Sequence, residues 1–181
     1  MKYLRKRGTF VKLSSKDATL IPTMAVASAV SHMAFGPLVN RTFHVPGPTL
    51  AGLVIMVPLL VIGAITFRRG LIMITSTLNG VILSAFVPIG FLAIPIYAIV
   101  GLTLELFCWR SFTILLRPLY SFLAAGIANG ISVLLFATIA LGIRNFVILF
   151  LAVGVGFLSG ALGGMIASAI SIRIRDIHWA T

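Results

Sequence analysis

Acidic residues are scarce in this 181-residue chain, which has Asp17, Glu105 and Asp176 against fourteen lysines and arginines. Charged residues of both signs make up only 9% of the sequence, whereas about a quarter is usual in soluble domains. An ordinary soluble domain is therefore excluded. Asp17 and Asp176 lie beside basic residues near the chain ends, where we expect water to solvate them, but Glu105 closes a long uncharged run and needs another explanation.

Cysteine and enzyme motifs are scarcer still. Cys108 is the single cysteine, which excludes an internal disulfide and a cysteine-based metal cluster, so we expect it to pack as a small hydrophobe. The sequence has no HExxH, GxSxG or Walker-type motif, and no second carboxylate in the apolar runs to share acid–base work with Glu105. We predict that the chain is not an enzyme, hydrolyses no ATP, and needs no cofactor or metal.

Apolar residues fill most of the chain, at 60% of the sequence with a mean hydropathy of +1.16. A membrane-spanning helix needs about 20 mostly apolar residues. We therefore predict an all-α integral membrane protein, a compact bundle of six transmembrane helices. The predicted spans are 18–36, 48–67, 71–88, 91–109, 118–141 and 145–170. They form a transmembrane domain (18–172) between a basic cytoplasmic tail (1–17) and a short C-terminal cytoplasmic tail (173–181).

The net charge of +11 follows membrane topology. The charges separate apolar runs and do not gather on one soluble surface, so we expect no binding to nucleic acid. With six spans and both termini in the cytoplasm, twelve basic residues lie inside and only Arg41 and Arg144 lie outside. This is the positive-inside bias, and it predicts that both termini are cytoplasmic.

Two connections between the spans have distinct compositions. The longest polar break, 36–48, holds three prolines and two glycines, which predicts an ordered loop or lid in place of a helix. Its residues Arg41, Phe43 and His44 would be able to close over a ligand that enters from outside. The link near 88–91 is short and apolar, which predicts a tight hairpin between the third and fourth spans.

Polar side chains inside the spans are few, and a charge in hydrocarbon costs about 2.5–3.5 kcal/mol on insertion scales. They therefore normally face the bundle interior or a cavity. These residues are His32, Thr75, Ser76, Asn79, Glu105, Asn129, Ser132 and Ser159. Glu105 has two interpretations, which stay open: it pairs with Arg110, about 8 Å further along the helix, or it anchors a ligand.

The other candidates for ligand binding are uncharged at neutral pH. Asn79 and Asn129 would suit the edge of a heterocycle, or would equally join helices by hydrogen bonds. Tyr97 would stack on an aromatic ring, because it lies within a span and its hydroxyl needs a partner. His32 and Glu105 would form a proton relay if they met. The candidate set is completed by His44.

Small residues recur every four positions in two spans. Ala25 and Ala29 share one face of the first span, and the last span has Gly156, Gly160 and Gly164. Such faces let helices approach closely in a bilayer. Packing within the bundle is one interpretation, and for Ala25 and Ala29 a docking face for another protein is the second.

These features together resemble the substrate-binding S components of energy-coupling factor transporters. The resemblance rests on six short spans, a basic tail, the first-span sequence AVASA, a Pro/Gly-rich first outer loop and the second-span sequence PGPTLAGLVIMVPLLVIGAITFRRG. The stretches LIMITSTLNGVILSAF and LAIPIYAIVGLTLELF are similar to the third and fourth helices of the subgroup assigned to thiamine or hydroxymethylpyrimidine. It covers residues from about 18 to 170.

The resemblance implies a binding subunit of an importer in a prokaryotic plasma membrane. It implies that a vitamin or precursor binds from outside, under the loop between the first two helices. It also implies that the chain docks, through Ala25 and Ala29, on a transmembrane T component driven by two cytoplasmic ATPases. The ligand candidates Glu105, Asn79, Asn129, Tyr97, His32 and His44 come from their polarity and not from the resemblance.

Two other functions fit parts of the sequence. A stand-alone ion- or proton-coupled carrier would need several ionisable groups along a path, and only Glu105 and His32 are available. A non-binding assembly subunit of a larger membrane complex would use Glu105 only to pair with Arg110.

Overall fold

The computed structural model describes residues 14–43, 49–87, 89–109 and 111–179, without the side chains of 36–43 and 176–179. Six α-helices make up most of this part of the chain, and it contains no strand. They are α1 (Ser15–Phe43), α2 (Gly52–Thr66), α3 (Leu71–Ser84), α4 (Ala93–Phe107), α5 (Pro118–Leu135) and α6 (Phe146–Trp179). The shorter helical segments are η1 (Gly90–Leu92), η2 (Phe112–Leu116) and the π-helical η3 (Phe136–Ala140).

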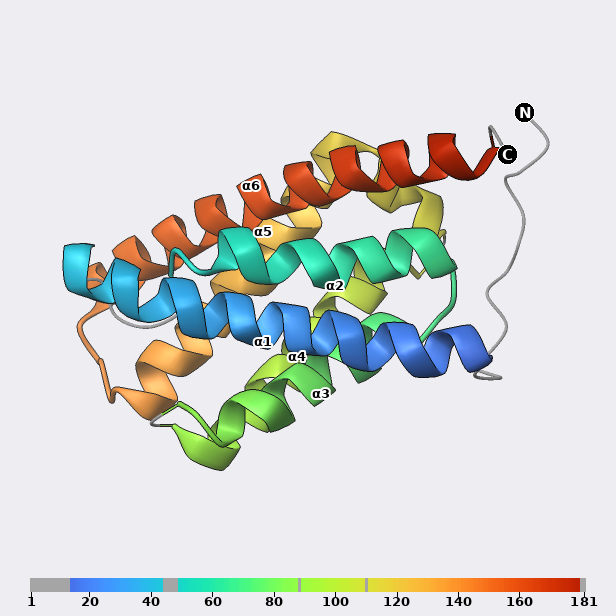
Figure 1. Cartoon of the computed structure of the whole chain (residues 1–181). Helices are drawn as coiled ribbons and strands as arrows, with labels where there is room; N and C mark the ends of the chain where they lie inside the picture. Colours follow the sequence, from blue (N-terminus) through green and yellow to red (C-terminus); the bar gives the residue numbers. More distant parts are fainter. Residues whose placement is uncertain (1–13, 44–48, 88, 110, 180–181) are drawn as a thin grey trace.

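The helices pack as a bundle in which α2 lies between α1 and α6 (Figure 1). The pairs α3–α4 and α5–α6 are antiparallel hairpins, and α6 also packs along α2. The first turn of α1 and the last turn of α6 lie at the same end of the bundle (Figure 1). The chain therefore passes along the bundle an even number of times, as the predicted six-span topology requires.

Among the described residues, four segments are long and apolar enough to cross a membrane. They are Ser15–Phe35, Gly90–Phe107, Pro118–Ala140 and Phe146–Arg175. The helices α2 and α3 are apolar but have only 15 and 14 residues. At about 1.5 Å per residue they are near 20 Å long, short of a hydrocarbon core of about 30 Å. The all-helical fold is confirmed, and two of its six helices are shorter than full spans.

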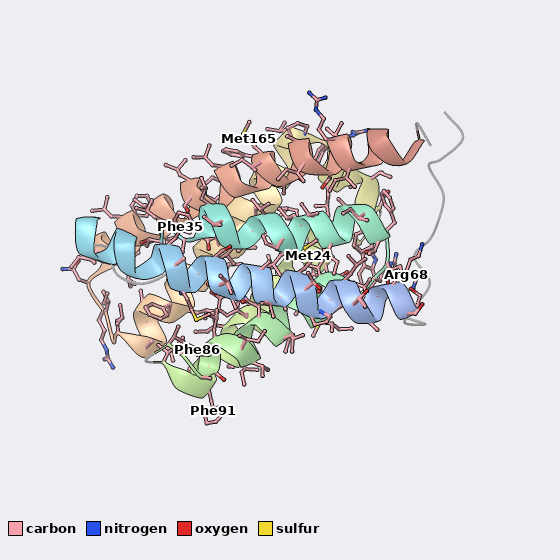
Figure 2. The ribbon with its side chains drawn as sticks, viewed as in Figure 1. Met24, Phe35, Arg68, Phe86, Phe91 and Met165 are labelled. Atoms are coloured by element: carbon pink, nitrogen blue, oxygen red, sulfur yellow. The ribbon has the colours of Figure 1, made fainter. Side chains whose placement is uncertain are left out.

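The outer surface of the bundle is apolar. Figure 2 shows Phe86, Phe91 and Met165 at the surface, and 66%, 83% and 44% of these side chains, respectively, is exposed. Large exposed apolar surfaces are unusual on soluble monomers and are typical of chains that contact lipid or a partner.

The prediction of a loop over 36–48 is wrong for its first part, because α1 continues as a helix to Phe43. A proline inside a helix costs about 3 kcal/mol, because it removes one hydrogen bond and crowds the preceding turn, so Pro37 disfavours a helix here without excluding one. The remaining residues of this break, including His44, lie outside the described residues. At the other terminus α6 remains helical to Trp179, across the predicted C-terminal tail.

The glycines of α6 allow close helix packing, as their spacing predicted. A Cβ atom at Gly160 would lie 2.5 Å from the carbonyl oxygen of Ala125, and one at Gly164 would lie 2.1 Å from that of Ser121. Both contacts are with α5. Gly163, on the adjacent face, approaches the backbone of α2 equally closely.

Candidate functional site

A small cavity lies between α1, α3, α4 and α5, at the end of the bundle away from the first turn of α1 and the last turn of α6. It is lined by His32, Leu83, Val87, Ile89, Ile96, Tyr97, Ser132 and Phe136. Its volume is about 20 Å³, enough for about one water molecule. The π-helical segment η3 begins at this cavity with Phe136, and π-helical turns occur frequently at functional sites.

Two predicted ligand residues meet at this cavity. The hydroxyl of Tyr97 lies 2.8 Å from Nδ1 of His32, and the two rings are edge to face with centroids 6.3 Å apart. Either group donates, depending on the histidine tautomer. Tyr97 is 4% exposed, so the contact joins α1 to α4 inside the bundle.

Asn79 is completely buried on α3, and neither its amide nitrogen nor its amide oxygen has a hydrogen-bond partner. It lies one helical turn before Leu83, which lines the cavity. Its polar neighbours on α3 are satisfied, because Thr75 donates to Leu71 O and Ser76 donates to Tyr97 O at 2.6 Å. A buried polar group without a partner costs about 1–3 kcal/mol, so Asn79 is an exception that needs an explanation.

Asn129 has the role of joining helices. Its amide nitrogen donates to Gly156 O on α6 at 2.7 Å, and it packs where the backbone of Gly52 approaches from α2. A Cβ atom at Gly52 would lie 2.0 Å from this amide nitrogen. The residue is 1% exposed and is not among the described residues that line the cavity.

Glu105 caps the start of a neighbouring helix. Its Oε1 accepts a hydrogen bond from the backbone N–H of Ile72 at 3.0 Å, and the carboxylate also faces the N–H groups of Gly70 and Met73. The first N–H groups of a helix have no partner within it, and Gly70 provides no side-chain cap for α3. The carboxylate thus satisfies backbone groups that would otherwise be buried unpaired. Arg110, the predicted ion-pair partner, lies outside the described residues.

Ala25 and Ala29 are both 0% exposed, because they face the interior of the bundle. Between them on the chain, the Ser28 hydroxyl donates to Ile55 O of α2 at 3.4 Å. Their small size lets α1 approach its own bundle. Neither side chain offers surface to another protein in this conformation, so both alanines serve packing within the bundle here, and the docking face stays a prediction.

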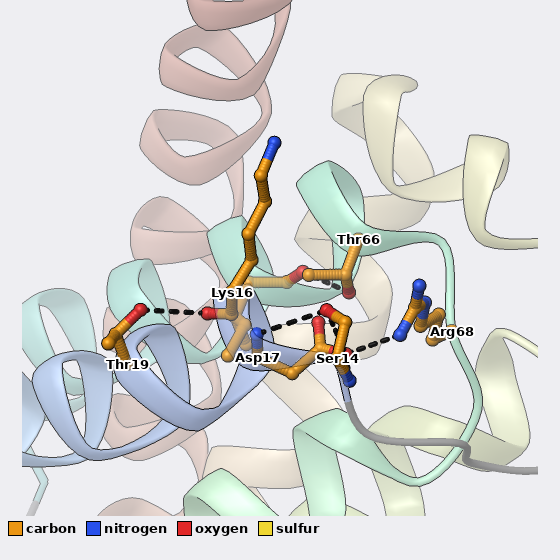
Figure 3. A network of polar contacts seen from close by, with 7 residues as sticks. Ser14, Lys16, Asp17, Thr19, Thr66 and Arg68 are labelled. Carbon is orange, nitrogen blue, oxygen red and sulfur yellow. Dashed lines mark hydrogen bonds and ion pairs between the residues drawn. The ribbon is translucent and has the colours of Figure 1, made fainter.

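Asp17 is buried, at 3% exposure, and the expectation that water solvates it is wrong. It accepts hydrogen bonds from the backbone N–H and hydroxyl of Ser14, at 2.7 and 2.9 Å, and forms an ion pair with Arg68 (Figure 3). The ion pair ties the first turn of α1 to the link between α2 and α3. The sequence could not predict this ion pair from a local pattern, because 51 positions separate Asp17 from Arg68.

The apolar residues that line the cavity could not be predicted from the sequence. Leucine, valine, isoleucine and phenylalanine are equally common on lipid-facing surfaces, so nothing in the sequence distinguishes Leu83, Val87, Ile96 and Phe136 from lipid-facing residues. Ser132 was one of the polar residues within the spans, and the structure adds it to the His32–Tyr97 pair. Within the described residues, no three His, Cys, Asp or Glu side chains lie close enough together to hold a metal ion.

Comparisons with known proteins returned no match to a family model, a curated protein or a solved structure. The similarity to S components therefore rests on the sequence features described above.

Proposed function

We propose that this chain is a membrane-embedded substrate-binding subunit that captures a small nutrient at the His32–Tyr97 end of the bundle. In the form implied by its resemblance to S components, it takes thiamine or hydroxymethylpyrimidine from outside a prokaryotic plasma membrane. It then docks on a transmembrane T component that two separate ATPases drive. Binding and not catalysis is the role in this proposal.

The observation that carries the proposal is the meeting of polar side chains from different helices at one end of an apolar bundle. His32 comes from α1, Tyr97 from α4 and Ser132 from α5, and all three line one cavity. Polar groups inside membrane helices usually mark substrate pathways or bundle contacts. Five arginines belong to the opposite end of the bundle: Arg68, Arg69, Arg117, Arg173 and Arg175. By the positive-inside rule the end with the cavity would therefore face outwards.

The cavity has to enlarge before it can hold a nutrient. Ligand pockets usually have volumes of about 300–1,000 Å³, against about 20 Å³ here. The described conformation is therefore the closed one in this proposal. Movement of α1 would open the cavity, since α1 contributes His32 alone to the part of the lining that the structure describes. The same movement would uncover Ala25 and Ala29, so docking through these residues requires α1 to separate from α2.

An ion-coupled carrier is less well supported. Glu105 lies at the start of α3 beside Ile72, and His32 lies at the cavity beside Leu83. These two positions on α3 are about 16 Å apart. The two ionisable groups predicted for a relay are thus separated by the length of a helix.

A thermal-shift screen of the purified full chain in detergent, against B vitamins and their precursors, tests the proposal. A ligand at a hundredfold excess over its Kd stabilises the folded state by about 2.7 kcal/mol. We expect a rise in Tm with a thiamine-related compound, and a smaller rise in Tyr97→Phe, which loses the hydroxyl that bonds His32. No shift with any vitamin, together with ion transport by the chain alone in liposomes, would support the carrier. No shift and no transport would support an assembly subunit.

A further inference from the structure

We infer that the ligand of this site is uncharged, and that Asn79 recognises it through an adjacent hydrogen-bond donor and acceptor, as on the amide or amidine edge of a heterocycle. The inference rests on the proposed binding function and specifies its substrate class. Three observations carry it: the lack of charge at the described cavity lining, the two free hydrogen-bonding groups of Asn79, and the packing that holds Asn79 beside Tyr97.

The described residues that line the cavity include no lysine, arginine, aspartate or glutamate. The carboxylates of Asp17 and Glu105 are held at the opposite end, by Ser14 with Arg68 and by the start of α3. A charged ligand would lose its hydration without gaining a counter-charge from these side chains, which is strongly unfavourable. Glu105 therefore does not supply a counter-charge to a cationic ligand in this cavity.

Asn79 supplies two unused hydrogen-bonding groups in a closed interior. Its carbonyl oxygen accepts, its NH₂ group donates, and both are buried and unpaired. A ligand edge with one donor next to one acceptor satisfies both groups at once. The unpaired state is not general for buried asparagine in this bundle, since Asn129 donates to Gly156 O.

The residues on either side of Asn79 in α3 fix its position next to the α4 segment that carries Tyr97. Ser76 donates to the backbone oxygen of Tyr97, and a Cβ atom at Gly80 would lie 3.0 Å from Tyr97 Cβ. This close packing holds Asn79 on α3 one helical turn from Leu83, which lines the cavity, although Asn79 itself is not part of the described lining in this closed form. The rings of Tyr97, His32 and Phe136 lie at the cavity itself. A flat aromatic ring would lie among these rings with its polar edge towards Asn79.

Two matched variants, Asn79→Leu and Asn129→Leu, test the inference, because each replaces a buried amide by an apolar group of similar size. Without ligand, we expect Asn79→Leu to keep or raise Tm, since it removes an unpaired amide, and Asn129→Leu to lower Tm, since it removes a hydrogen bond. The probes are hydroxymethylpyrimidine, its analogue without the amino group, and thiamine, whose thiazolium ring is permanently charged. All are titrated against the full chain in detergent at pH 8.

We expect the wild-type chain to bind the neutral aminopyrimidine more tightly than either other probe, and Asn79→Leu to weaken that binding about tenfold or more. Wild-type affinity in Asn79→Leu would overturn the role of Asn79 and leave the binding function intact. Tighter binding of thiamine would overturn the claim of an uncharged ligand. A loss of ligand-free stability in Asn79→Leu equal to that in Asn129→Leu would show that Asn79 is already paired, for example by a buried water, and would also overturn the inference. Failure of the wild-type chain to bind any probe or vitamin would remove the proposed function itself.

Discussion

Several buried or half-buried polar side chains in this bundle bind backbone atoms of another helix. Glu105 on α4 accepts from the start of α3, Asn129 on α5 donates to α6, and Ser76 on α3 donates to α4. In a hydrocarbon environment no water is available to pair such groups, so a helix contact is their most stable partner. Asn79 differs from these residues in having no partner.

Replacement of Glu105 tests its role as a cap at the scale of one residue. We expect Glu105→Ala to lower the free energy of unfolding by about 1–2 kcal/mol, because the first N–H groups of α3 lose their acceptor. Glu105→Gln keeps an acceptor oxygen and should cost less. Unfolding in mixed micelles measures both. Normal stability combined with lost ligand binding would instead identify Glu105 as a ligand anchor.

Cys108 offers a second residue-scale test. The side chain is 0% exposed in the native bundle, and it is the single cysteine of the chain. We expect a maleimide to label it slowly in the folded protein and rapidly after denaturation, because the reagent reaches only accessible thiols. Rapid labelling of the folded chain would mean that the end of α4 opens readily.

At the scale of whole elements, α2 and α3, which are too short to be full spans, begin at buried residues and depend on their neighbours. The Ser159 hydroxyl on α6 accepts from Leu53 N at 2.9 Å and donates to Leu50 O at 2.8 Å, at the start of α2. Glu105 supplies the equivalent contact for α3. The residues just before these helices, Ala51 and Gly70, provide no side-chain cap of their own. Side chains on α6 and α4 thus complete the starts of α2 and α3.

Glycine substitutions in α6 test how closely this helix must approach α5. We expect Gly164→Ala to destabilise the protein by about 1–3 kcal/mol, because its Cβ atom would lie 2.1 Å from Ser121 O and the helices would have to separate. Gly154→Ala is the matched control, since no atom lies within 4 Å of its Cβ position. Higher helix propensity should make that variant neutral or more stable. Equal losses in thermal unfolding for the two variants would contradict the close contact.

At the scale of the whole molecule, basic residues are distributed unequally between the two ends of the bundle. Lys16, Arg68 and Arg173 belong to the end that contains the first turn of α1, and Arg144 belongs to the α5–α6 connection at the other end. From this distribution the positive-inside rule predicts that both termini are cytoplasmic.

Cysteine accessibility tests this orientation. In a Cys108→Ala background, we expect a membrane-impermeant maleimide to label Arg144→Cys in intact cells. Lys16→Cys should react only after the membrane is permeabilised, because it would lie on the cytoplasmic side. The opposite pattern would reverse the orientation and place the cavity at the cytoplasmic end.

The sequence by itself determined the number of helices and most of their limits, because apolar runs broken by charges, glycine and proline are local signals. It also predicted the glycine contacts of α6, where four-residue spacing defines one face of a helix. Only the tertiary structure decided which way Ala25, Asn79 and Asn129 face, and that Glu105 reaches the start of α3. A helix that is apolar on all sides has no periodic pattern to fix its rotation, so these orientations depend on packing against the other helices.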